Sequence, residues 1–513
     1  MKTKESAAGY GEIELLTPYG VQTIYNLKWI RTMNDHVKLY VTGIVSEEVK
    51  DSCLDTASSV DQIELNQLKD GQVVRPLFKG MVSELAVRKA RDIYYIELEA
   101  ISHTYRMDIE QKSRSFQQKE MLYTQMIDKI VADYLGADSI DNIAISTKLG
   151  KLIVQYKETD WQFLKRMASH FGAVLIPDAT ANGPKFWFGL PEGQTGKLNS
   201  DHYSLAKDVT MYRKTIENYD ESLQVADFQT YTIESTQYFN MGDRITIKNT
   251  EHIVAQATAT MKQGILTYEY VLAPEAGIRQ NLIHHSSLRG GAIEGNLIDV
   301  AKDKVRVHLE IDEAQSKDEA TWFPYSTFYT AEGNSGFYSM PELGDTVQLY
   351  FPSDKEEEAV VISSVRKGGA SNPKTADPTT KYWGTNHGKE MKMNASEVMF
   401  TAKEGTIFLR LDTEAGIEIH SQHNVLFQAE KNLEMTGGQA IQFKAGESIH
   451  MTCHASSIVM DGITDIQGEL VKMEGWVKAA VPTASEEEDD DDDDELGAAV
   501  LGMIPDTGGG GLG

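Results

Sequence analysis

Apolar and polar residues alternate along most of the first 110 residues, as in VKLYVTGIVSEEV and IYYIELEAISHTY, and polar turns such as LKDGQ separate the runs. A period of two indicates strands that bury one face. We therefore expect an antiparallel β-barrel over residues 1–110. Similar patterns resume over residues 191–285 and predict a second barrel, and the five short strands of residues 286–367 are typical of a small OB-type barrel.

The residues between the first two barrels follow a helical pattern. Apolar residues recur at every fourth position from Leu122 to Tyr134, which predicts an amphipathic helix. A second helix is expected after Thr159, because Thr159 and Gln162 have the spacing of a capping box and a broad apolar face follows them. The Asn-Gly-Pro sequence that comes next predicts a hairpin turn.

A repeat of eight residues runs from Asn424 to Cys453. Period two inside each block predicts a strand with one apolar face, and period eight predicts one strand and one turn per rung. Such short rungs cannot cover their own apolar face, so we expect three chains to wind about a common axis as a triple-stranded intertwined β-helix. The predicted trimer core consists of Val425, Phe427, Leu433, Met435, Ile441, Phe443, Ile449 and Met451.

Composition excludes some classes of protein. The net charge of −28 argues against a protein whose main task is to bind nucleic acid. Cys53 and Cys453 lie far apart, so no disulfide framework is expected. The first residues contain no apolar signal core, and no segment is long and apolar enough to span a membrane. We therefore expect synthesis in the cytoplasm without a signal peptide, no nucleic-acid partner and no stable membrane anchoring.

The closely spaced His450, Cys453 and His454 invite a metal or nucleophile interpretation, because imidazole and thiolate are good ligands. In the eight-residue register, however, Cys453 points toward the axis and both histidines point outward. His420 and His423 likewise lie on opposite faces. The sequence therefore predicts no catalytic, cofactor-binding or metal residue, although a metal held by three chains on the needle axis stays open.

An acidic run, EEEDDDDDDE, occupies residues 486–495 and is followed by LGAAVLGMIPDTGGGGLG. A charge run of this kind is most often a solvated, disordered tail. A tail that only solubilises would not need the short apolar patch that follows it. Two interpretations therefore stay open: a solubilising tail, or an end that docks a tip protein or cargo.

The segment QYKETDWQFLKRMASHFG resembles the hub motif of VgrG-type spikes and of phage late-control or tail-hub proteins. FKGMVSEL and LEAISHTYRMD are similar to the first barrel of that family, GAIEGNLIDVAKDKVRVHLEID is similar to its OB domain, and the octads are similar to its needle. The hub-motif residues that the resemblance singles out are Tyr156, Asp160, Trp161 and Leu164.

This resemblance implies a homotrimeric central spike and baseplate hub of a contractile injection system, without enzymatic activity. The system would be a type VI-like machine, an extracellular injection particle or a phage tail. Expected partners are the tail-tube protein, baseplate proteins and a PAAR-like tip protein or cargo effector. The spike would be assembled into the particle and delivered to the exterior or the target cell on contraction. Many phage spikes carry a lysozyme domain where this chain has only a linker.

The predicted fold is mainly β: two hub β-barrels with interspersed helices, an OB-fold barrel and a C-terminal β-helix. The predicted parts are hub barrel one (1–110), a helix-containing hub segment (111–190), hub barrel two (191–285), the OB domain (286–367), a linker (368–388), the needle (389–476) and an acidic, Gly-rich tail (477–513).

Two other functions stay open at this level. A phage-tail β-helix enzyme that degrades surface polysaccharide would need a groove of paired carboxylates and aromatics, which the short octads do not obviously offer. A nucleic-acid binder could use the OB unit, but the acidic composition argues against it.

The eight-residue register makes a prediction about assembly. Phe427→Asp or Phe443→Asp should disrupt the trimer, because three carboxylates without partners would meet on one dry axis. The measurement is the native mass of the variant together with its melting temperature. A variant that remains trimeric and equally heat-resistant would contradict the register.

Overall fold

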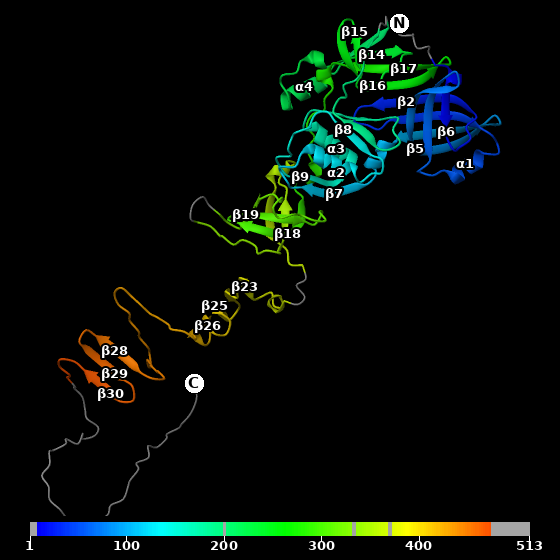
Figure 1. The fold of residues 1–513 in the computed structure, drawn as a ribbon. Coiled ribbons are helices and arrows are strands. Elements are labelled where there is room, and N and C mark those ends of the chain that lie inside the picture. Colours follow the sequence, from blue (N-terminus) through cyan, green and yellow to red (C-terminus); the bar gives the residue numbers. More distant parts are fainter. Residues whose placement is uncertain (1–7, 199–201, 331–334, 368–371, 473–513) are drawn as a thin grey trace, which may run out of the picture. The chain divides into compact units, whose positions relative to one another are not determined.

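The computed structural model describes residues 8–198, 202–330, 335–367 and 372–472 and divides into two compact units, Met1–Thr375 and Ala376–Gly513 (Figure 1). Most of the regular structure is β-strand, which confirms the mainly β prediction. Across the described ranges, no helix is long and apolar enough to cross a membrane. The α-helices are α1 (Lys50–Thr56), α2 (Tyr123–Val131), α3 (Asp160–Ser169) and α4 (Val209–Asn218).

The strands of the two predicted barrels belong to one continuous twelve-stranded sheet. The connection is the antiparallel pairing of β2 with β16, which runs from Thr32 opposite Gln256 to Lys28 opposite Thr260. Local alternation cannot reveal this pairing, because its partners lie far apart in sequence. In spatial order the path is β1 (Ile13–Leu16), β4 (Gln62–Lys69), β5 (Gln72–Ala90), β6 (Ile93–Ser102), β3 (Lys38–Val45), β2 (Thr23–Thr32), β16 (Thr250–Lys262), β17 (Ile265–Ala273), β14 (Gln229–Ser235) and β13 (Tyr203–Lys207), with β12 (Thr195–Lys197) and β15 (Arg244–Ile247) beside it.

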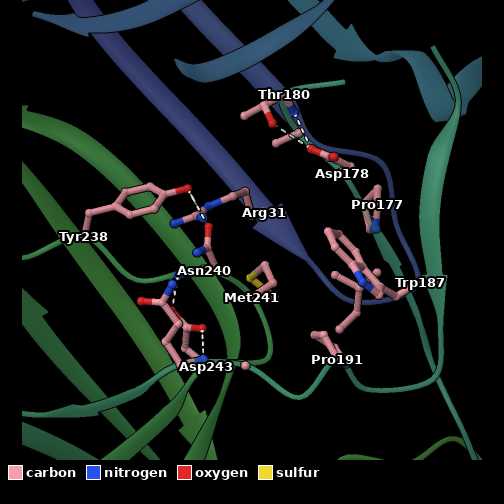
Figure 2. Close-up of a pocket in the computed structure, with 14 residues that line it drawn as sticks. Arg31, Pro177, Asp178, Thr180, Trp187, Pro191, Tyr238, Asn240, Met241 and Asp243 are labelled. Atoms are coloured by element: carbon pink, nitrogen blue, oxygen red, sulfur yellow. Dashed lines mark hydrogen bonds between the residues drawn. The ribbon is translucent and has the colours of Figure 1, made fainter. Parts of the chain in front are cut away.

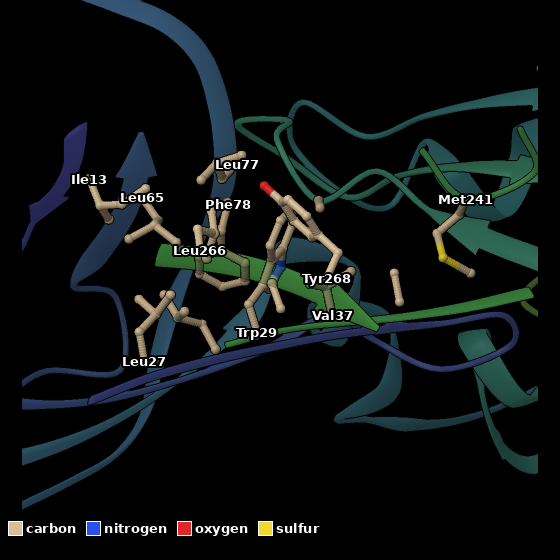
Figure 3. Close-up of a cluster of buried hydrophobic side chains, with 14 of the residues drawn as sticks. Ile13, Leu27, Trp29, Val37, Leu65, Leu77, Phe78, Met241, Leu266 and Tyr268 are labelled. Atoms are coloured by element: carbon tan, nitrogen blue, oxygen red, sulfur yellow. The ribbon is translucent and has the colours of Figure 1, made fainter. Parts of the chain in front are cut away.

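One hydrophobic core serves both halves of this sheet (Figure 3). It includes Leu27 and Trp29 of β2, Phe78 of β5, and Leu266 and Tyr268 of β17, all of them at most 2% exposed. Full burial of an aliphatic or aromatic side chain contributes roughly 1.5–3 kcal/mol. The shared core therefore holds the two strand sets together as one body.

Two helices interrupt regions for which the sequence pattern indicated only strands. Helix α1 buries Cys53, whose Sγ donates to the carbonyl of Tyr19 at 3.3 Å. Helix α4 begins after Asp208, whose side chain accepts a hydrogen bond from the Met211 amide at 2.8 Å. Aspartate is a common N-cap residue, so Asp208 was the local sequence signal that indicated the start of α4.

Residues 107–188 form a second core around α2 and α3. Thr159 and Gln162 make the predicted capping box at the start of α3. The predicted hairpin around Asn-Gly-Pro is also present, because β10 pairs antiparallel with β11. Helix α2 ends at Val131, earlier than the pattern indicated, and a turn leads to Gly136 at φ +74°. The strands of this layer are β7 (Gln111–Phe116), β8 (Asp138–Asp141), β9 (Ile153–Thr159), β10 (Leu175–Pro177) and β11 (Lys185–Phe188).

A five-stranded barrel follows, as the sequence predicts. Its ends approach each other where Tyr325, next to β20, bridges to Val361 of β22, and the Ser326 amide donates to the Val361 carbonyl at 2.8 Å. The sheet order is β20 (Phe323–Pro324), β19 (Lys304–Leu309), β18 (Ala292–Ala301), β21 (Thr346–Tyr350) and β22 (Val360–Ser364).

The described residues of the second unit form two antiparallel sheets. Strand β23 begins at Lys381, inside the range predicted as a linker, and the segments expected as irregular rungs, around residues 416–421 and 456–467, lie in antiparallel meanders instead. Between the sheets, residues 422–448 contain no assigned strand in this single chain, although the octads predict strands there. The strands are β23 (Lys381–Gly384), β24 (Glu390–Met393), β25 (Glu397–Lys403), β26 (Ile407–Asp412) and β27 (Gly416–Ser421), then β28 (Ile449–Cys453), β29 (Ser456–Met460) and β30 (Thr464–Gln467).

Candidate functional site

The hub-motif residues lie where β9 leads into α3, and each of them faces a different neighbour. Asp160 is fully buried and receives hydrogen bonds from Gln155 Nε2 at 2.8 Å and Tyr134 Oη at 2.7 Å. Lys112 Nζ lies 3.0 Å from the same carboxylate, and Arg114 also donates to it. A buried carboxylate with this many partners is compensated, so Asp160 ties α3 to β7 and to the end of α2.

Trp161 joins α3 to the turn between β2 and β3 of the large sheet. Its side chain is 2% exposed, its ring centroid lies 4.7 Å from that of His36, and its Nε1 donates to the Asn34 carbonyl at 3.4 Å. Asn34 in turn exchanges two hydrogen bonds with the backbone of Leu175, at 2.7 and 2.8 Å. Leu164 lies on the same helix in the second core. The motif therefore connects the sheet to the helical layer.

Strand β9 also belongs to the core of the OB domain. Leu152 and Val154 are buried in the OB cluster beside Val361, and Tyr156 packs against the same cluster. Successive side chains of a strand point to opposite faces. One short strand therefore contributes to the OB core, while α3, which follows it directly, packs in the hub.

A buried arginine completes this junction. Arg166 of α3 is 2% exposed, and its Nε and Nη2 donate to the two carboxylate oxygens of Glu158 at 2.9 and 3.0 Å. Its Nη1 donates to Glu356 Oε1 at 3.0 Å, and Nη2 also donates to the Val154 carbonyl at 2.7 Å. Glu356 Oε1 accepts the Val154 amide at 3.0 Å as well. The guanidinium thus links the helix, β9 and the OB domain.

The buried charge of Arg166 is compensated only while its guanidinium stays in contact with Glu158 and Glu356. Burial raises the pKa of Glu356, and the Arg166 charge opposes this rise. The pKa of Arg166 is raised by Glu356 and Glu158 against the effect of burial, so the guanidinium remains charged. His285 Nε2 lies 3.5 Å from Glu158, and burial lowers the pKa of that imidazole. Separating this guanidinium from its two carboxylates is costly, because it would leave a buried charge without a partner.

A second set of hydrogen bonds joins β7 to the OB domain. The backbone amide and the hydroxyl of Ser115 both donate to Asp312, each at 2.6 Å. The Gln117 side chain donates to the Val307 carbonyl at 3.0 Å and accepts the Thr321 amide at 3.1 Å. Two separate chain segments, β7 with the residue that follows it and β9, therefore fasten the OB domain to the hub.

The histidine and cysteine residues considered as metal ligands or nucleophiles do not share one face. Cys453 shares a face of β28 with Ile449 and Met451, His450 lies on the opposite face, and His454 occupies a turn at φ +48°. Among the described residues, no group of three or more His, Cys, Asp or Glu side chains could hold a metal ion. The prediction that the chain has no metal site therefore stays a prediction, and a metal shared by three chains on the needle axis stays open.

The predicted trimer-core residues are solvent-exposed in this single chain. Most of the eight are between 44% and 59% exposed, for example Phe443 at 59% and Met451 at 44%. The axial register itself stays a prediction. The sequence did not point to the Arg166–Glu356 pair, because an arginine and a glutamate 190 residues apart carry no local signal. The single hint was a charged residue among the apolar positions of α3.

The OB domain is the part of the chain that matches a known protein family. Residues 292–365 match the family model of the type VI secretion system/phage-baseplate injector OB domain, which confirms the OB prediction. No curated protein matches the chain. The search of solved structures gives matches at low sequence identity.

A chain of the Francisella PdpA–VgrG complex in its half-lidded form is 9% identical, with a TM-score of 0.50, over 77% of this chain and 83% of that one. A component of the E. coli type VI secretion system is 14% identical, with a TM-score of 0.49, over 69% and 100%. A prophage MuSo2 tail protein from Shewanella oneidensis is 9% identical, with a TM-score of 0.41, over 53% and 99%. At these identities, the Francisella match shows a shared fold.

The contacts of Glu356 predict that a conservative substitution at this residue lowers the stability of the protein strongly. Glu356→Gln keeps the acceptor for the Val154 amide but removes the charge that faces Arg166, so it should lower the free energy of unfolding by roughly 2–4 kcal/mol. Urea unfolding followed by tryptophan fluorescence measures the loss.

The neighbouring Glu357→Gln is the matched control. Glu357 pairs with Lys151 at 3.2 Å on the surface, where its side chain is 48% exposed. Its loss should cost less than about 1 kcal/mol. Equal effects of the two substitutions would contradict the role assigned to Glu356.

Proposed function

We propose, from the injector OB domain at residues 292–365 and the VgrG-type spike fold of the chain, that this protein is the trimeric central spike and baseplate hub of a contractile injection system. The hub would seat the trimer in the baseplate, the OB domain would form a collar, and the needle would pierce the target envelope. Its work is mechanical, and the rigid β7–β9–α3 junction supports such a role.

The observation that carries the trimer is the absence of a core among the described residues of the second unit. No described residue between 376 and 472 is buried. A sheet with an apolar face must bury that face against another layer to be stable. None of the described residues 376–472 supplies this layer, so we take other copies of the chain as its source.

The sheet β23–β27 has one apolar and one polar face. The cross-strand register and the alternation of side chains place ten apolar residues on one face. They are Trp383, Met391, Met393, Val398, Phe400, Ile407, Leu409, Leu411, Ile417 and Ile419.

The opposite face of this sheet has its own ion pairs. Glu397 accepts from Lys392 and from Arg410, each at 2.7 Å, and Arg410 also pairs with Asp412 at 2.8 Å. Because these charges are already compensated, this face suits solvent. The apolar face is then the one that meets the other two chains about the threefold axis.

The octads need partners for a further reason. Backbone amides and carbonyls of a strand must find hydrogen bonds, and residues 422–448 have no assigned strand pairing within one chain. In the proposed trimer, strands of neighbouring chains would provide these bonds while the apolar residues meet on the axis. The β-helix would then form only on assembly.

The partners follow from the same assignment. The hub would contact the tail-tube protein and baseplate proteins, and the needle tip would carry a PAAR-like protein or a cargo effector. The similarity to a chain of a PdpA–VgrG complex supports a spike that binds another protein. The spike would be made in the cytoplasm and delivered to the exterior or the target cell on contraction.

Adjacent residues on β27 test the trimer. Ile419 lies on the apolar face at 53% exposure, and His420 lies on the polar face. Ile419→Asp should reduce the native mass from three chains toward one, because three buried carboxylates would lack partners. His420→Asp should leave the trimer intact. A wild-type monomer, or equal behaviour of the two variants by light scattering, would overturn the proposal.

The acidic tail lies outside the described residues, and its docking role is a hypothesis. Its motivation is the apolar patch that follows residues 486–495. Deletion of residues 485–513 should abolish loading of the tip protein or cargo while leaving the trimer mass otherwise unchanged. Loading is measured by co-purification of tip and cargo with the spike, and unchanged loading would sink the hypothesis.

A further inference from the structure

A pocket of about 410 Å³ opens between the large sheet and the β10–β11 hairpin (Figure 2). Trp187 and Pro191 line it on one side, and Tyr238 and Arg31 line it on the other. The hub-motif residues do not line it. Its walls combine apolar and aromatic side chains with polar and charged ones in similar number, so an apolar ligand body and a polar ligand group could both be held.

Two glycines fix the shape of the pocket. Gly193 lines it, and a Cβ on Gly193 would lie 2.4 Å from the Gly242 carbonyl oxygen. Both glycines have positive φ, +64° and +83°, which favours glycine over other residues. The two chain segments therefore cross in direct backbone contact, and the pocket is preformed.

Arg31 is the unusual group in this pocket. It is 3% exposed, and its guanidinium lies 4.4 Å from the Trp29 ring centroid and 4.9 Å from that of Tyr238. Nη1 donates to Tyr238 Oη at 3.2 Å and Nη2 donates to the Phe239 carbonyl at 2.9 Å, but Nε has no acceptor.

No carboxylate among the described residues forms an ion pair with Arg31. A buried cation without an anionic partner is costly. Its rings and neutral acceptors compensate only part of that cost, and Arg31 still has N–H groups to offer. The pocket therefore has a positive group that lacks a counter-charge.

The other charged groups of the pocket limit what it can accept. Asp178 Oδ1 accepts the Thr180 amide and hydroxyl, both at 2.8 Å. Asp243 accepts the Gln194 amide at 2.8 Å and the Asn240 amide at 2.7 Å. Both carboxylates hold their own loops, and their charge repels a doubly charged phosphate ester more strongly than a singly charged carboxylate.

We infer that this pocket binds a single carboxylate on an apolar or aromatic body, with the carboxylate toward Arg31 and the body between Trp187 and Tyr238. The carboxylate comes either from a free small acid or from an acidic side chain next to an aromatic residue in a partner protein. The inference does not depend on the spike assignment, because it rests on the pocket alone.

Asn240→Asp is the substitution that tests it. Tyr238 Oη receives a hydrogen bond from Arg31 and donates to Asn240 Oδ1 at 2.9 Å. Aspartate has the shape of asparagine, so this variant places an anionic oxygen one hydroxyl away from Arg31. The built-in charge would take the place of the ligand carboxylate. Asn218→Asp, on an exposed residue of α4 outside the pocket, is the control with the same change of charge.

Binding is measured by calorimetric titration of the full-length protein with two probes, benzoate and the blocked peptide acetyl-Phe-Glu-Phe-amide. Their uncharged counterparts, benzamide and the Gln peptide, are titrated in parallel. At least one acid should bind at least about tenfold more tightly than its amide, since a hydrogen bond to a charged group is worth more than a neutral one. Asn240→Asp should remove that preference, and Asn218→Asp should keep it.

The acid that binds identifies the source of the carboxylate. The inference is overturned if neither acid binds, if each acid binds no better than its amide, or if Asn240→Asp binds the acid as well as the wild-type protein does. Thermal melting of Asn240→Asp confirms that the variant is folded. Arg31→Met, judged by the same titrations, provides a second and independent loss of the charge.

Discussion

The first unit depends on one guanidinium group. Arg166 reaches from α3 to Glu158 of β9 and to Glu356 of the OB domain, and it also donates to the Val154 carbonyl. Apart from this group, the hub and the OB domain meet through apolar packing, the hydrogen bonds of Ser115 and Gln117, and the surface pair Lys151–Glu357. A buried charge with two carboxylate partners makes separation costly, because opening leaves an uncompensated ion.

The two units differ in how their apolar surface is buried. The first unit has three hydrophobic cores of its own, and its sheet halves share one of them. The second has strands and an apolar sheet face but no buried residue among those described. Stability that is missing from one chain must come from association. Folding of the hub and assembly of the needle are therefore separate events in the proposed trimer.

The pocket at Arg31 departs from this division, because it is neither a core nor an apolar face. Its glycines and loop-holding aspartates keep an opening beside a buried cation. Apolar side chains in this position would have avoided the cost of burying a cation without an anionic partner. A preformed, charged pocket is the feature of this hub that is most easily explained by a ligand.

Local sequence determined those features whose physical cause lies within a few residues. The capping box at Thr159, the hairpin at Asn-Gly-Pro and the five OB strands depend on spacing and turn chemistry, and all appear in the structure. Tertiary structure alone decided that β2 pairs with β16, joining two predicted barrels into one sheet, and that Arg166 meets Glu356. These contacts join segments roughly 200 residues apart, and no local period encodes which distant edge or charge a residue will meet. The octads show the same limit of local sequence. Their pattern shows that an apolar face exists, but the association of chains decides what covers that face.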